Sequence, residues 1–246
     1  MTDSKISKMK PKAVVCLSGG MDSCVCTALA ARDYEVYAVH FSYGQRTERR
    51  ELLSAEGIAR EVGVKELMAL KMDLFRKIGG SALTDAAIAV PDAEAEDAGM
   101  GEGPSSERRG SEVPVTYVPF RNAHFLAAAV SWAEVLGAKT VILGAVEQDS
   151  SGYPDCRPAY YTAFNELIRQ GTKEGLIRVE TPLIAMRKSE IVRLGVELGA
   201  PLHVSWSCYT GGAEACGVCE SCVLRLRAFR DAGAVDRIVY AGRDVR

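Results

Sequence analysis

The chain has no apolar run long enough to span a membrane and no excess of either charge. Of its 246 residues, 30 are Lys or Arg and 32 are Asp or Glu, which leaves a formal charge of -2. No apolar run approaches the roughly 18 residues of a membrane span, and the start of the chain lacks the apolar core of a signal peptide. These absences predict a cytoplasmic protein. A near-neutral net charge argues against a chain that grips nucleic-acid phosphates through long-range charge, and a local basic patch remains open. We expect small-molecule partners and no stable nucleic acid.

Four of the eight cysteines form a cluster near the end of the chain. Disulfides are rare in a reducing compartment, so clustered thiols indicate a metal site first. Cys208, Cys216, Cys219 and Cys222 follow the spacing C-x7-C-x2-C-x2-C. Short gaps let neighbouring thiolates reach one ion, and four sulfurs close a tetrahedral zinc site. We predict one structural Zn²⁺ per chain. An iron-sulfur cluster is the alternative, although the C-x3-C-P continuation of bacterial ferredoxins is missing.

Short apolar runs alternate with helix-like segments along the first 200 residues. Five runs predict buried strands: 12–17, 35–43, 65–73, 140–146 and 176–182. Five segments predict helices: 22–34, 47–63, 122–138, 159–175 and 187–200. This alternation predicts an α/β fold with a doubly wound, mostly parallel sheet and helices on both faces. We expect a nucleotide-binding domain at 1–200 and a zinc-binding segment at 201–246 packed on it.

One long stretch, residues 91–114, holds prolines, glycines and acids and almost nothing to bury. Such a composition predicts a mobile surface loop. A loop of this length is either a disordered insertion or a lid over an active site, and both remain open.

A glycine-rich turn, CLSGGMDS at residues 16–23, links the first predicted strand to the first predicted helix. Backbone N–H groups at such a turn, together with the helix dipole, favour an anion such as phosphate. The glycines permit close backbone approach, the serines offer hydroxyls, and Asp22 can cap the helix or hold Mg²⁺. The turn lacks the lysine of a Walker A loop, which argues for a different cleavage of ATP. A plain strand-to-helix turn is the alternative.

The string SGGMDS resembles the SGGxDS loop of the ATP pyrophosphatases, which cleave ATP between its α- and β-phosphates and adenylate a substrate. Four further strings follow in order: FSYGQR at 41–46, DSSGYPDCRP at 149–158, ETPL at 180–183 and SCY before the cysteine triple. Together they are similar to the 7-cyano-7-deazaguanine synthases of queuosine precursor biosynthesis, over nearly the whole chain. The resemblance implies a carbon-nitrogen ligase that converts 7-carboxy-7-deazaguanine and ammonium to the nitrile, with ATP and Mg²⁺. It also implies a homodimer.

The resemblance further implies which residues form the site. The ATP loop would comprise Leu17, Ser18, Gly19, Gly20, Met21, Asp22, Ser23, Cys24 and Val25. Catalysis would use Ser18, Asp22, Ser23 and Lys188. The candidate substrate residues are Tyr43, Gln45, Arg46, Arg121, Asn122, Asp149, Tyr153, Asp155 and Arg157. A deazaguanine presents two donors that suit a carboxylate, and its own carboxylate suits a guanidinium. Which aspartate and which arginine serve these roles is left open.

Two other functions fit part of the pattern. One is a related pyrophosphatase that adenylates a tRNA base for sulfuration, and the other is a non-catalytic nucleotide-binding protein. The chain has no room for a glutaminase module of about 100 to 200 residues, so ammonia would arrive free or from a partner. The resembling family usually carries a small residue where Phe120 stands. We assign no role to His40 or His203.

Overall fold

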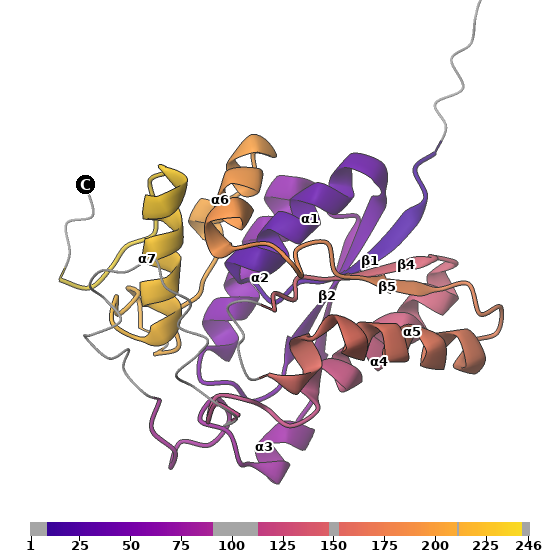
Figure 1. The fold of residues 1–246 in the computed structure, drawn as a ribbon, viewed down its shortest axis with the longest axis horizontal. Coiled ribbons are helices and arrows are strands. Elements are labelled where there is room, and N and C mark those ends of the chain that lie inside the picture. Colours follow the sequence, from indigo (N-terminus) through magenta and orange to yellow (C-terminus); the bar gives the residue numbers. More distant parts are fainter. Residues whose placement is uncertain (1–8, 91–112, 148–152, 211, 243–246) are drawn as a thin grey trace, which may run out of the picture.

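The computed structural model describes residues 9–90, 113–147, 153–210 and 212–242 (Figure 1). The predicted loop at 91–114 lies almost entirely outside these residues, and so does Asp149. Among the described residues, no helix is long and apolar enough to cross a bilayer. The cytoplasmic location stays a prediction.

Five parallel strands form one sheet. They are β1 (Lys12–Cys16), β2 (Glu35–Ser42), β3 (Glu66–Lys71), β4 (Thr140–Leu143) and β5 (Arg178–Glu180). Their order is β3-β2-β1-β4-β5, with each neighbouring pair parallel. The chain therefore winds outward in one direction from β1 to β3 and then returns to the other side of β1. This confirms the doubly wound parallel sheet that the sequence predicts.

Seven α-helices accompany the strands in the described part of the chain. They are α1 (Met21–Asp33), α2 (Glu48–Val62), α3 (Leu74–Ile78), α4 (Arg121–Leu136), α5 (Pro158–Gly171), α6 (Lys188–Glu197) and α7 (Glu220–Ala232). Five of them match predicted helices within a few residues. Gly63 follows the last residue of α2, and its left-handed φ of 79° suits a residue without a Cβ. The sequence did not predict α3 or α7.

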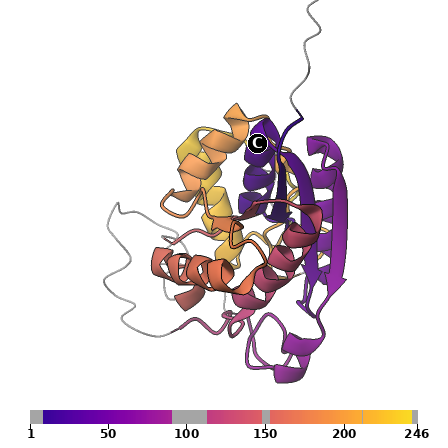
Figure 2. The same ribbon diagram turned by 90° about the vertical axis from the view of Figure 1, so that its right-hand side faces the viewer.

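The helices bury both faces of the sheet (Figures 1 and 2). Neighbouring residues of β1 point to opposite faces: Val14 joins a core with α4 and α5, whereas Val15 joins a core with α1, α2, α6 and α7. Both valines are fully buried. Phe229 of α7 belongs to this second core. The segment after residue 200 thus contributes to the main core, and its treatment as a separate domain stays a prediction.

A buried ion pair joins α7 to the end of the described chain. Arg225 donates from Nε to Oδ2 of Asp236 at 2.7 Å and from Nη2 to Oδ1 at 3.0 Å. The two side chains are 1% and 2% exposed. Arg225 also donates to the hydroxyl of Ser205 and the carbonyl of Leu202, while Tyr240 donates to Asp236. Both charges are therefore paired and hydrogen-bonded, which is what burial of a charge requires.

Candidate functional site

A cavity of about 350 Å³ lies at the carboxyl ends of β1, β2 and β4. The strand order reverses between β1 and β4, and doubly wound folds bind ligands in the crevice at such a reversal. The turn after β1 and the residues Gly144 to Val146 after β4 both line this cavity. The fold therefore brings the glycine-rich turn to the place where a ligand would be expected.

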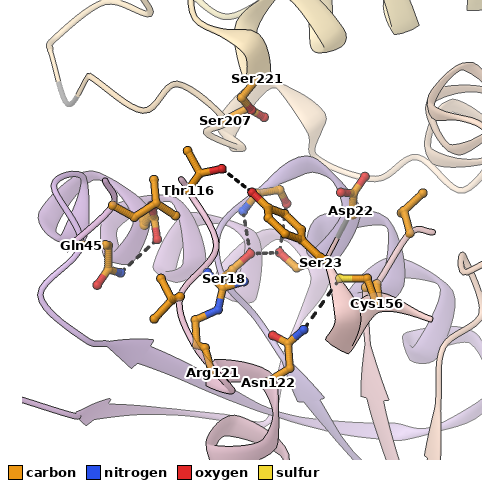
Figure 3. Close-up of a pocket in the computed structure, with 18 of the residues that line it drawn as sticks. Ser18, Asp22, Ser23, Gln45, Thr116, Arg121, Asn122, Cys156, Ser207 and Ser221 are labelled. Atoms are coloured by element: carbon orange, nitrogen blue, oxygen red, sulfur yellow. Dashed lines mark hydrogen bonds between the residues drawn. The ribbon is translucent and has the colours of Figure 1, made fainter. Parts of the chain in front are cut away.

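The turn is held in shape by its own serines (Figure 3). Ser18 and Ser23 are hydrogen-bonded through their hydroxyls at 3.0 Å, and Ser23 also donates to the carbonyl of Gly20 at 3.0 Å. Gly20 precedes the first turn of α1, and no side chain caps that helix end. The first amides of α1 are thus not occupied by a capping side chain, as an anion-binding helix end requires.

Two glycines allow the backbone around the turn to pack closely. Gly19 has a φ of 91°, and a Cβ built on it would lie 2.3 Å from the carbonyl oxygen of Glu51 in α2. A Cβ on Gly144 would lie 3.0 Å from backbone atoms of Asp22 and Ser23. Larger residues at either position would displace the turn from α2 or from the end of β4.

Asp22 and Lys188 meet at the edge of the cavity. Lys188 is the first residue of α6, and its Nζ lies 2.7 Å from Oδ2 of Asp22. The side chain of Lys188 is 19% exposed and that of Asp22 is 25% exposed. The other carboxylate oxygen, Oδ1 of Asp22, is buried and has no hydrogen-bond partner among the described residues. This oxygen is available as a ligand for a cation.

Another part of the cavity wall carries an arginine, a tyrosine and a buried aspartate. Arg121, at the start of α4, donates from Nη1 to the hydroxyl of Tyr43 at 3.0 Å. Asn122 donates its backbone N–H to Oδ2 of Asp155 at 3.3 Å and its side-chain amide to the carbonyl of Asp155 at 3.2 Å. Burial raises the pKa of Asp155, against the opposing effects of Arg121 and the Asn122 amide. Tyr153 lies beside them, hydrogen-bonded to Thr116.

Arg46 reaches the cavity but directs most of its donors elsewhere. Its Nε donates to the carbonyl of Ala82 at 2.8 Å, and its Nη2 donates to the carbonyls of Asp85 and Ile88. Gln45 is similarly occupied, since its amide nitrogen donates to Phe41 and Glu51. Both side chains therefore connect segments of the cavity wall through hydrogen bonds within the protein.

Most of the predicted site residues line the cavity. They are Leu17, Ser18, Gly20, Met21, Asp22, Ser23, Tyr43, Gln45, Arg46, Arg121, Asn122, Tyr153, Asp155 and Lys188. Four others do not line it: Gly19, Cys24, Val25 and Arg157. Cys24 and Val25 are fully buried in the second core, and Arg157 is exposed at the start of α5. Asp149 lies outside the described residues.

The cavity also has a wall that the sequence analysis did not predict. It is formed by Tyr117, Trp206, Ser207, Tyr209, Glu220, Ser221 and Arg225. Figure 3 shows Ser207 and Ser221 on the side of the cavity opposite Arg121 and Asn122. Only the string SCY, at residues 207–209, pointed to this region. The others come from elements whose position depends on the tertiary fold.

The four clustered cysteines adjoin this wall. The sulfurs of Cys208, Cys216, Cys219 and Cys222 lie within 4.8 Å of one another. The Sγ atoms of Cys216 and Cys222 are 3.9 Å apart, close to the sulfur separation of about 3.8 Å in a tetrahedral site with bonds of about 2.3 Å. Backbone amides of Cys216 and Cys219 donate to cluster sulfurs at 3.3 Å. The cluster could therefore hold a metal ion.

A backbone hydrogen bond joins the cysteine segment to the glycine-rich turn. Trp206, two residues before Cys208, donates its N–H to the carbonyl of Gly19 at 2.8 Å. Its ring donates from Nε1 to the carbonyl of Cys208 at 2.9 Å, and Arg50 of α2 stacks on it at 4.4 Å. Trp206 is 3% exposed. The cysteine cluster and the turn are thus parts of one packed unit.

Phe120 precedes α4 in a left-handed conformation, with φ of 56° and ψ of 22°. It is the one non-glycine residue with positive φ in the described part of the chain. This conformation is unfavourable for a residue with a Cβ. Arg121 and Asn122 nevertheless make the contacts described above, so the phenylalanine does not prevent their placement.

Comparison with known proteins agrees with this geometry. The family model for queuosine biosynthesis protein QueC matches residues 12–233. A 7-cyano-7-deazaguanine synthase from Acidobacterium capsulatum is 71% identical over 95% of this chain and 98% of its own. One from Koribacter versatilis is 60% identical over 94% of each chain.

A solved structure of the U34-tRNA thiolase NcsA from Methanococcus maripaludis, with its 4Fe-4S cluster, is 14% identical, with a TM-score of 0.48. The alignment covers 93% of this chain and 70% of the thiolase. A likeness of that degree carries no argument about substrate or metal. The family match and the two synthases cover nearly the full chain, and the protein belongs to the QueC family of queuosine biosynthesis proteins.

Proposed function

We propose that the protein is a 7-cyano-7-deazaguanine synthase, an ATP-dependent carbon-nitrogen ligase. The observation that carries this proposal is the 71% identity to a synthase of that name over 95% of the chain. The site supports it, because a phosphate-type turn and a pocket with arginine, aspartate and tyrosine share one cavity. The substrates are ATP, ammonium and 7-carboxy-7-deazaguanine.

ATP binds with its β- and γ-phosphates on the turn from Ser18 to Ser23. The amides at the start of α1 carry no capping side chain, and the helix dipole favours negative charge at this end. Lys188 lies beside the turn and offers a cation to the phosphates. The α-phosphorus then lies further into the cavity, within reach of a substrate carboxylate.

The deazaguanine binds on the side formed by Arg121, Asn122, Tyr153 and Asp155. A carboxylate at Asp155 suits the N1–H and exocyclic amine of the base, and Arg121 suits the 7-carboxylate. Tyr153 offers an aromatic ring on which a flat base can stack. The second aspartate considered for this role, Asp149, stays a prediction because it lies outside the described residues.

The reaction proceeds in two activations. A carboxylate oxygen attacks the α-phosphorus of ATP and releases pyrophosphate, which leaves an acyl adenylate. Ammonia attacks the acyl carbon, AMP departs with the bridging oxygen, and loss of a proton leaves the amide. The amide oxygen attacks a second ATP in the same way, and loss of AMP and of both amide protons then leaves the nitrile. In each activation the carboxylate or amide oxygen, a poor leaving group, is adenylated so that it can depart as part of AMP.

Asp22 fits a Mg²⁺ ion, because its Oδ1 atom is buried without a hydrogen-bond partner in the described part of the chain. Carboxylate oxygens and phosphates are the ligands that Mg²⁺ prefers. When bound, the ion would neutralise charge on the triphosphate. The other oxygen of Asp22 remains paired with Lys188, which positions that lysine beside the phosphates.

Zn²⁺ fits the four cysteines, since four thiolates leave no open position for a reacting water. When bound, zinc would supply no step of the reaction and would stabilise the segment that carries Trp206, Ser207 and Tyr209. That segment contacts the turn through the hydrogen bond from Trp206 to Gly19. We infer a structural role for the metal.

The test is incubation of the purified protein with ATP, Mg²⁺, ammonium and 7-carboxy-7-deazaguanine, followed by mass spectrometry of the base. We expect the nitrile, with the amide as an intermediate. Unchanged base would contradict the proposal. Parallel reactions with tRNA and a sulfur donor test the sulfuration alternative, for which we expect no product because the chain is near-neutral. Sedimentation analysis tests the expected homodimer.

A further inference from the structure

His40 is a fully buried histidine on β2, outside the cavity and without a role in the reaction described above. Its Nδ1 atom lies 2.9 Å from the carbonyl oxygen of Leu17. Its Nε2 atom is buried and has no hydrogen-bond partner among the described residues. A leucine or a valine would fill the space without a buried, unpaired ring nitrogen, but it could not donate a hydrogen bond to the Leu17 carbonyl. The feature that distinguishes histidine at this site is therefore its hydrogen bond to the Leu17 carbonyl.

The ring is neutral and carries its proton on Nδ1. A carbonyl oxygen can only accept, so the hydrogen bond to Leu17 requires a proton on the nearer nitrogen. Burial lowers the pKa of His40, against the opposing effects of the Leu17 carbonyl and of three glutamates. A charged ring would leave a second N–H buried without an acceptor, which is costly.

Leu17 is the last residue before the turn, and β2 contacts both its N–H and its carbonyl. Its N–H donates to the carbonyl of Val39 at 2.8 Å, and its carbonyl accepts from His40. Within one trans peptide the C=O and the N–H point in opposite directions. A Leu17 carbonyl held against β2 therefore directs the N–H of Ser18 away from β2, toward the side on which β4 lies.

We propose that His40 is a positioning residue that fixes the Leu17–Ser18 peptide and thereby orients the N–H of Ser18, the first residue of the glycine-rich turn proposed to bind phosphate. This inference rests on the proposed binding of ATP at that turn. If so, loss of the side-chain donor at the δ position of residue 40 weakens nucleotide binding, although this side chain does not contact the nucleotide. Asparagine carries a nitrogen at the same branch point as Nδ1, whereas leucine fills the space with no donor.

The experiment compares His40→Leu with His40→Asn in binding an ATP analogue that has a methylene group between its α- and β-phosphorus atoms. Titration calorimetry with Mg²⁺ gives the dissociation constant without turnover. We expect about a tenfold weaker constant for His40→Leu, the size of one net hydrogen bond, and a value within about threefold of wild type for His40→Asn. The KM for ATP should follow the same order. Ile58→Val, a buried change in α2, is the control for lost packing.

Two binding results would overturn the proposal: unchanged affinity in His40→Leu, or equal losses in both variants. Failure of the wild-type protein to bind the analogue would overturn it together with ATP binding at the turn. Binding without nitrile formation would instead remove only the proposed reaction.

A second measurement does not depend on the folding of any variant. Nitrogen-15 NMR of the wild-type imidazole reports which ring nitrogen carries the proton. We expect the proton of His40 on Nδ1. A proton on Nε2 alone would contradict the proposal, because Nδ1 could then not donate to the Leu17 carbonyl.

Discussion

Lys188 and Asp22, 166 residues apart in the chain, meet with Nζ and Oδ2 only 2.7 Å apart at the edge of the cavity. The first residue of α6 and the second residue of α1 come together because both helices pack on the same face of the sheet. A cation is thereby fixed beside the amides at the start of α1. The ion pair therefore connects the glycine-rich turn and the start of α1 to the start of α6.

Replacement of Lys188 tests whether this cation takes part in the reaction. Lys188→Met should lower kcat by about 100-fold to 1000-fold, the usual loss when one stabilising donor is removed from a developing negative charge. The fold should be retained, because the pair lies at the edge of the cavity and both side chains are partly accessible to solvent. Arg187→Met is the matched control, since Arg187 is more exposed and pairs with Glu190. Equal rates for the two variants would remove Lys188 from the mechanism.

The cysteine cluster makes a prediction about metal content. Cys219→Ser should reduce bound zinc below one ion per chain, lower the melting temperature and weaken ATP binding, because the segment after Trp206 would lose its anchor. Cys26→Ala removes a buried thiol of α1 outside the cluster and should keep one zinc. Elemental analysis and visible spectroscopy provide the measurements. An iron content with visible absorption would contradict the zinc assignment and favour an iron-sulfur cluster.

The buried pair of Arg225 and Asp236 should dominate the stability of the C-terminal segment. Asp236→Ala leaves the guanidinium buried without its partner, which costs about 3 to 5 kcal/mol in the free energy of unfolding. The matched exposed pair is Arg230 and Asp231, at 72% and 47% exposure, and Asp231→Ala should cost less than about 1 kcal/mol. Urea denaturation measures both. Similar losses in the two variants would show that the buried network is not a main source of stability.

Phe120 should carry backbone strain that glycine relieves. Phe120→Gly should raise the free energy of unfolding by about 1 kcal/mol relative to Phe120→Ala, because both remove the exposed ring but only glycine adopts a φ of 56° freely. Comparison of the two variants cancels the loss of the side chain. A less stable glycine variant would show that the left-handed conformation is not the governing factor here.

Much of the fold could be predicted because buried parallel strands appear as continuous apolar runs. The ends of the strands were less predictable. The apolar run at 140–146 ends as a strand at Leu143, since Gly144 packs against the backbone of Asp22 and Ser23. The run at 176–182 forms only Arg178–Glu180, because β5 is an edge strand that pairs with the short β4 alone.

The candidate site was also only partly predictable from the sequence. Local motifs predicted the turn and the cysteine cluster, because their residues are close in sequence. The donors of Arg46, the pairing of Arg225 with Asp236 and the contact of Trp206 with Gly19 all join distant segments. Nothing in the local pattern distinguishes an arginine that holds a loop from one that faces a substrate. Those assignments required the packed structure.

The most direct test of the proposed mechanism follows the oxygens of the substrate carboxylate. When both are labelled with oxygen-18, each activation should transfer one of them to AMP, so every AMP released during nitrile formation should carry one labelled oxygen. Pyrophosphate should be unlabelled and ADP absent. Label in inorganic phosphate or in water, or formation of ADP, would contradict cleavage of ATP between its α- and β-phosphates on the turn from Ser18 to Ser23.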